Sequence, residues 1–183
     1  MNPRLLLSLA ALALVAAPLA AADRALKFDR DQSTIEVAVK ATVDSFVGAL
    51  KNYALTGTVD DAGHITGAEL AFRFRDVATG KPKRDAAMHE WQHTDDFPDA
   101  KFTLVTLNAA AGATEARGRF TFHGVTRELR FPVTISQHGP TYAIDGDAAI
   151  DTRDYGLPVI RLMLALKVDP LVHVRFHFQA KAA

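Results

Sequence analysis

Residues 34–43 read Thr-Ile-Glu-Val-Ala-Val-Lys-Ala-Thr-Val, and their alternation of side chains decides the fold class. A period of two places every second side chain on the same face of a strand. The run is long for one strand, roughly 30 Å at an ordinary rise per residue. It predicts a half-buried strand with one face in the core and the other toward solvent.

The same alternation recurs along the chain between short turn signals such as His138-Gly139-Pro140. Regular strands with hairpin-sized gaps favour an antiparallel meander, either a barrel or a sandwich. A polar face on each strand excludes a parallel sheet covered on both sides. The sequence therefore predicts an all-β fold of about eight strands. The further runs cover residues 53–59, 69–75, 101–107, 115–122, 128–135, 142–150 and 172–179.

Composition excludes several classes of protein. The chain has 183 residues, which fits one domain, and 21 Lys+Arg balance 21 Asp+Glu. A neutral chain lacks the basic face that a general nucleic-acid binder needs, so we expect no nucleic-acid partner. The sequence contains no Cys, which excludes disulfides, thiol catalysis and Cys-ligated metals.

Residues 1–22 resemble a secretory signal peptide. Arg4 precedes an apolar run from Leu5 to Leu19, and Ala20-Ala21-Ala22 supplies an A-x-A cleavage site. The run is shorter than the ~20 residues of a transmembrane helix. We expect cleavage before Asp23, a domain over residues 23–183, and export to a periplasm.

A helix is predicted around residues 83–93, where the alternation stops. Pro82 suits a first helical turn, and Phe97-Pro98 lies beyond the end. Residues 89–93 read His-Glu-Trp-Gln-His, the His-Glu-x-x-His pattern of zinc hydrolases, in which both imidazoles lie on one helical face. The helix is short and zinc hydrolases of this type are not eight-stranded barrels, so coincidence is the favoured interpretation. The sequence also has no Gly-x-Ser-x-Gly, no P-loop and no Gly-x-Gly-x-x-Gly, and we predict that the protein is not an enzyme.

Four motifs follow one another along the chain. They are Asp29-Arg-Asp-Gln-Ser-Thr-Ile35, the stretch from Lys83-Arg84-Asp85 through Phe97-Pro98 to Phe102, Gly118-Arg-Phe-Thr-Phe-His-Gly-Val-Thr-Arg127 and Ile150-Asp-Thr-Arg-Asp-Tyr-Gly156. In this order they resemble the YceI family of exported lipocalin-like proteins. The first is similar to the start of that family's first strand, the second is similar to its helix and the segment after it, and the third is the most specific match.

The chain also departs from the family's pattern. Phe46-Val47-Gly48 has a different spacing, Met88 and Trp91 occupy the helix, and residues 157–168 are unusually apolar. These differences indicate a subgroup within the family.

The resemblance implies an eight-stranded antiparallel lipocalin-like barrel around an apolar channel that binds a polyisoprenoid lipid, either an isoprenoid quinone or a polyprenyl phosphate. It implies no reaction and no cofactor other than the bound lipid. Two alternatives stay open beside a periplasmic lipid-binding protein. One is a barrel with a filled core that serves a quinone-handling membrane cytochrome. The other, less favoured, is a zinc hydrolase that uses His89, Glu90 and His93. Either a monomer or a homodimer is compatible with the sequence.

The candidate site residues form two groups. A barrel of eight strands is just wide enough to fill with side chains or to hold one ligand, and apolar burial gains roughly 25 cal/mol per Å². Basic side chains near the helix could bind a phosphate or quinone head group. The predicted head-group rim is Lys83, Arg84 and Arg153. The predicted tunnel wall is Val37, Val39, Phe72, Phe74, Met88, Trp91, Phe102, Phe120, Phe122, Phe131, Tyr142, Phe176 and Phe178.

Overall fold

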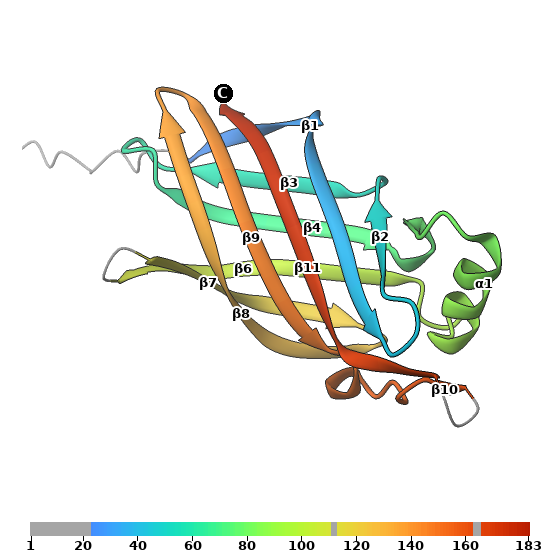
Figure 1. Cartoon of the computed structure of the whole chain (residues 1–183). Helices are drawn as coiled ribbons and strands as arrows, with labels where there is room; N and C mark the ends of the chain where they lie inside the picture. Colours follow the sequence, from blue (N-terminus) through green and yellow to red (C-terminus); the bar gives the residue numbers. More distant parts are fainter. Residues whose placement is uncertain (1–22, 111–112, 163–165) are drawn as a thin grey trace, which may run out of the picture.

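The computed structural model describes residues 23–110, 113–162 and 166–183. The expected signal peptide over residues 1–22 lies outside the described residues. Strands make up 67% of the structure, and the described part also contains one α-helix and two short 3₁₀ turns (Figure 1). The elements are β1 (Arg24–Ala41), β2 (Phe46–Leu50), β3 (Ala54–Val59), β4 (Ile65–Arg73), η1 (Phe74–Asp76), β5 (Val77–Ala78), α1 (Pro82–Trp91), β6 (Asp99–Ala110), β7 (Ala113–Phe122), β8 (Val125–His138), β9 (Thr141–Asp151), η2 (Thr152–Tyr155), β10 (Arg161–Leu162) and β11 (Leu166–Ala182).

The sheet closes on itself. Its order runs β11-β9-β8-β7-β6-β4-β3-β1, and β1 pairs with β11 to complete the ring. All of the pairs are antiparallel, as in Ile35 opposite Phe176 and Gly146 opposite Phe176. The short strands β2, β5 and β10 lengthen the wall at one end. This architecture confirms the predicted eight-stranded antiparallel barrel with one short helix.

Strand β1 begins earlier than its alternation predicts. It spans 18 residues, from Arg24 to Ala41, whereas the regular alternation begins only at residue 34. The two halves are separated by a register shift between Asp29 and Thr34, where the Ser33 hydroxyl donates to the Asp29 carbonyl at 2.5 Å. The Gln179 amide of β11 then donates to the Ser33 hydroxyl at 3.1 Å. The strand continues in the sheet across this bulge. Because the bulge interrupts the alternation of inward and outward side chains, the sequence pattern does not identify the first half of β1.

The barrel is closed at the end where β1 begins and β11 finishes. Val59 and Tyr142 are 0% and 1% exposed there, and they pack with Leu26 and Ala180. The Tyr142 hydroxyl donates to the Gly63 carbonyl at 3.0 Å. A buried phenol requires such a partner, so Tyr142 both fills and fastens this end.

Helix α1 lies at the opposite end of the barrel (Figure 1). It covers residues 82–91, close to the predicted 83–93, and Pro82 begins its first turn. It ends where His93 adopts a left-handed φ of 53°. Met88 and Trp91 pack onto the barrel core from this helix. In the described part of the chain, no helix has the length and apolar character needed to cross a membrane.

Candidate functional site

Two apolar cavities lie one behind the other inside the barrel. The outer cavity, beside α1, has a volume of about 120 Å³, and the inner cavity, toward the closed end, has about 140 Å³. Apolar cavities of this size stay dry and accept apolar ligands. Five side chains line both cavities and form the waist between them. The waist consists of Val37, Phe72, Phe120, Ile150 and Val174.

The inner cavity is lined only by apolar side chains. A belt of rings crosses its wall, with 5.4 Å between the Phe102 and Phe131 centroids and 5.9 Å between Phe131 and Phe176. Phe176 stacks on Phe178 at 4.8 Å. Because each ring belongs to an inward-facing row, the alternation read from the sequence places the rings on one surface. This surface offers contact area and almost no hydrogen-bonding capacity.

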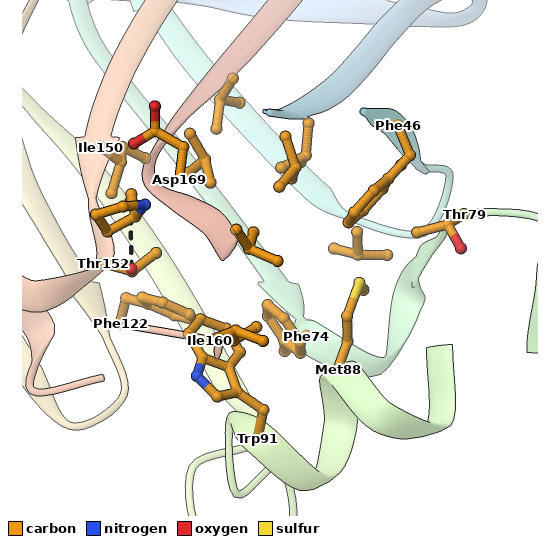
Figure 2. Close-up of a pocket in the computed structure, with 18 of the residues that line it drawn as sticks. Phe46, Phe74, Thr79, Met88, Trp91, Phe122, Ile150, Thr152, Ile160 and Asp169 are labelled. Carbon is orange, nitrogen blue, oxygen red and sulfur yellow. Dashed lines mark hydrogen bonds between the residues drawn. The ribbon is translucent and has the colours of Figure 1, made fainter. Parts of the chain in front are cut away.

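The outer cavity is covered by α1 and by the segment that follows η2. Figure 2 shows Met88 and Trp91 pointing from α1 toward the strands, with Ile160 close to the indole ring. The Trp91 indole Nε1 donates to the Pro158 carbonyl at 2.9 Å, which links the helix to this segment. We call the open end of the outer cavity, next to α1 and residues 158–160, the mouth.

Among the described residues, three polar side chains line the outer cavity. They are Thr79, Thr152 and Asp169. The Thr152 hydroxyl donates to the Pro170 carbonyl at 3.2 Å, drawn as the dashed line in Figure 2. No Lys or Arg is among the described residues that line either cavity.

None of the three predicted head-group rim residues is among the described residues that line either cavity. Arg84 binds Asp44 at 2.9 Å and stacks on the Phe46 ring, with 4.1 Å between the guanidinium carbon and the ring centroid. Arg153 binds Asp151 at 2.5 Å, and this hydrogen bond is the main cause that lowers the pKa of the Asp151 carboxyl. Lys83 is exposed on α1. The two arginines, one on α1 and one on η2, are thus engaged by different carboxylates.

The structure places every predicted tunnel residue but one in a cavity wall. Tyr142 lines neither cavity, because its hydroxyl is tied to Gly63 at the closed end. The alternating row that contains Tyr142 predicted an inward ring correctly but gave no indication of how far along the barrel the cavity extends. The wall positions fall in three sets: Val39, Phe74, Met88, Trp91 and Phe122 around the outer cavity, Val37, Phe72 and Phe120 at the waist, and Phe102, Phe131, Phe176 and Phe178 around the inner cavity.

Sequence reasoning missed the wall residues that lie outside regular alternation. Phe46 and Pro158 to Ile160 line the outer cavity. Leu26 and Phe28 line the inner cavity from the part of β1 before its bulge. The departures noted in the sequence, Phe46-Val47-Gly48 and the apolar segment 157–168, were the available signal. From these two stretches, Phe46, Gly48 and residues 158–160 line the outer cavity, where apolar side chains cover a cavity instead of facing a strand neighbour.

The residues of the His-Glu-x-x-His pattern do not have the arrangement of a zinc site. The motif needs both histidines on one helical face, but α1 ends at Trp91 and His93 lies beyond it with φ 53°. His93 is exposed, whereas the His89 ring packs against Phe74 with its Nε2 buried and without a hydrogen-bond partner. Within the described ranges, no three His, Asp or Glu side chains converge as metal ligands.

This geometry defines a class of protein: a closed antiparallel barrel around an apolar tunnel with one mouth. A family model of the YceI-like domain matches residues 26–180, and the chain belongs to that family. The resemblance seen in the four motifs is thereby confirmed. A search of the curated proteins found no match.

Solved structures share the fold at low sequence identity. BcnA of Burkholderia cenocepacia superposes with a TM-score of 0.74 and 20% identity, over 85% of this chain and 100% of that chain. A polyisoprenoid-binding domain from Saccharophagus degradans, implicated in plant cell wall breakdown, gives 0.63 and 16%, over 87% and 99%. A Campylobacter jejuni YceI protein gives 0.62 and 14%, over 76% and 86%. These likenesses support the fold.

Proposed function

We propose that the protein is a non-enzymatic periplasmic carrier that holds one polyisoprenoid lipid, with the tail in the inner cavity and the head at the mouth. The observation that carries this proposal is the pair of apolar cavities joined at one waist. A branched hydrocarbon tail gains affinity in proportion to the apolar area it buries, at roughly 25 cal/mol per Å². A fold neighbour described as a polyisoprenoid-binding domain supports the same ligand class.

The outer cavity favours an uncharged head group over a phosphate. Its polar lining consists of two hydroxyls and the Asp169 carboxylate, and the nearby Arg84 and Arg153 are engaged by Asp44 and Asp151. A phosphate beside a carboxylate and without a paired cation is electrostatically unfavourable. A quinone head group carries no charge and avoids this repulsion. The Thr79 and Thr152 hydroxyls already donate to Asp85 and to the Pro170 carbonyl, so the quinone ring would make mainly apolar contacts here. We therefore infer an isoprenoid quinone as the preferred ligand.

Lipid extraction tests the proposal directly. The protein is purified from the periplasm of its own source, extracted with organic solvent and analysed by mass spectrometry. We expect stoichiometric isoprenoid quinone. A lipid-free protein that also fails to bind added prenyl quinones and polyprenyl phosphates contradicts the proposal, and its absence from the periplasmic fraction contradicts the location.

A substitution at the waist separates a carrier from an accessory protein with a filled core. Phe120 lines both cavities and is 7% exposed. In a hollow barrel, Phe120→Trp blocks the waist and abolishes binding of long tails while the protein stays folded. In a filled core, the larger indole has no free volume and overpacking costs typically about 1–3 kcal/mol of stability. Circular dichroism and quinone binding on the same sample distinguish the two outcomes.

A further inference from the structure

Two glycines on the inner wall lie directly beneath aromatic rings. Gly146 of β9 is the antiparallel partner of Phe176 of β11, so both positions face the same side of the sheet. Ile144 and Ala148, two residues to either side of Gly146, line the inner cavity, which places that side inward. The Phe176 ring therefore covers a position with no side chain.

This ring supplies the three atoms nearest to the space beside Gly146. A Cβ placed on Gly146 would lie 2.3 Å from Phe176 Cζ, 2.6 Å from Cε1 and 3.0 Å from Cε2. Gly118 of β7 has the same relation to Phe102, whose Cζ lies 2.3 Å away, but the Thr103 carbonyl oxygen is also 2.6 Å away. At Gly118 a new methyl group meets backbone, whereas at Gly146 its three nearest atoms all belong to the far edge of a side chain that can rotate.

We propose that Gly146 sets the longest tail the inner cavity accepts, because it lets the Phe176 ring lie flat on the wall. A methyl group at position 146 lifts the ring off β9. The ring already touches Phe131 and Phe178 along the wall, at 5.9 Å and 4.8 Å between centroids, so the direction left for it is the cavity. The cavity then loses volume beyond the waist but none at the mouth. This inference rests on the proposed function, because it assigns the tail to the inner cavity.

The test compares a quinone with a short geranyl tail and one with a long solanesyl tail. For Gly146→Ala we expect the affinity for the solanesyl quinone to fall about tenfold, since the displaced tail loses contact worth one or two buried methylenes. The affinity for the geranyl quinone should stay within about twofold of the original protein. The matched control is Gly67→Ala in β4. A Cβ at Gly67 would lie 3.0 Å from its nearest atom, Thr58 Oγ1, and Gly67 lines neither cavity. It should leave both affinities unchanged.

A double variant keeps the inference falsifiable if Gly146→Ala folds poorly. Phe176→Leu removes the ring that the new methyl group would push, so Gly146→Ala/Phe176→Leu should bind the solanesyl quinone as Phe176→Leu does. An equal loss for both quinones, or a loss that persists in the double variant, overturns the inference. A parent protein that binds neither quinone overturns the proposed function instead, and the two failures are thereby distinguishable.

Discussion

Tyr155 shows at the scale of one residue how the outer cavity is supported. It is 2% exposed, and its ring meets Phe120 and Phe122 edge-on, with centroid separations of 5.6 and 5.7 Å. Burial, reinforced by the nearby Asp154 carboxylate, raises the pKa of the Tyr155 phenol to about 12. The neutral phenol is thus part of the folded barrel.

This raised pKa predicts a loss of stability in alkali. In the unfolded chain the phenol ionises near its ordinary pKa of 10.0, whereas in the folded protein it stays protonated until about 12. The unfolded state therefore releases a proton first, and stability falls as pH rises from about 10 to about 12, by about 2 kcal/mol. Urea unfolding of the original protein and Tyr155→Phe across this range measures the difference. Equal slopes for the two proteins would refute this assignment.

At this scale the sequence could predict the strands that contain Gly146 and Tyr142, but not the contacts that these two residues make. The rows that contain Gly146 and Tyr142 were assigned to strands correctly. Which ring covers Gly146 depends on the register between β9 and β11, and the depth of Tyr142 depends on a hydrogen bond to a residue 79 positions away. Neither relation leaves a trace in local periodicity, because both link segments that are distant in sequence.

At the scale of elements, helix α1 is fastened to the mouth on two sides. Trp91 binds the Pro158 carbonyl on one side, and Asp44, in the turn between β1 and β2, holds Lys81 at 3.3 Å and Arg84 at 2.9 Å on the other. The helix has no buried residue of its own. Its position therefore depends on these contacts as much as on packing, and such elements open at a low free-energy cost.

We expect Asp44→Asn to loosen α1 with little effect on global stability. Asp44 and Lys81 are 59% and 65% exposed, and exposed ion pairs contribute about 0–1 kcal/mol. Trp91 is the only Trp in the chain, so acrylamide quenching of its fluorescence reports the opening of α1. Quenching and quinone release should both increase a few-fold, whereas Asp145→Asn, which removes an exposed contact to His177 on the barrel wall, should change neither. An unchanged release rate would show that α1 does not control the mouth.

The elements themselves were largely predictable, and the exceptions have physical causes. Alternation identified the strands because half of every strand faces the interior. It failed over the first part of β1, where a bulge shifts the register, and over residues 158–160, where apolar side chains cover the mouth. The His-Glu-x-x-His spacing, for which the sequence already favoured coincidence, does not place two histidines on one helical face, because α1 ends between them.

At the scale of the whole molecule, stability and occupancy are linked. A ligand that binds only the folded barrel adds RT ln(1 + [L]/Kd), about 2.7 kcal/mol at a hundredfold excess over Kd. For a domain of this size, that corresponds to a rise in Tm of roughly 5–10 °C. We expect this rise with a long-tailed quinone and no rise with the same quinone ring lacking a tail. An equal rise with the bare ring would place the affinity at the mouth and contradict a tail-dominated site.

Tyr142, Val59 and Ala180 close one end of the barrel, so the tunnel is blind and opens at the mouth. A lipid held as proposed cannot be threaded through it and must leave by the route it came. The tail goes in first and comes out last, so the head is always the first part offered to an acceptor. Each delivery must finish before the next cargo is loaded, which gives exchange the alternating kinetics of a ping-pong shuttle.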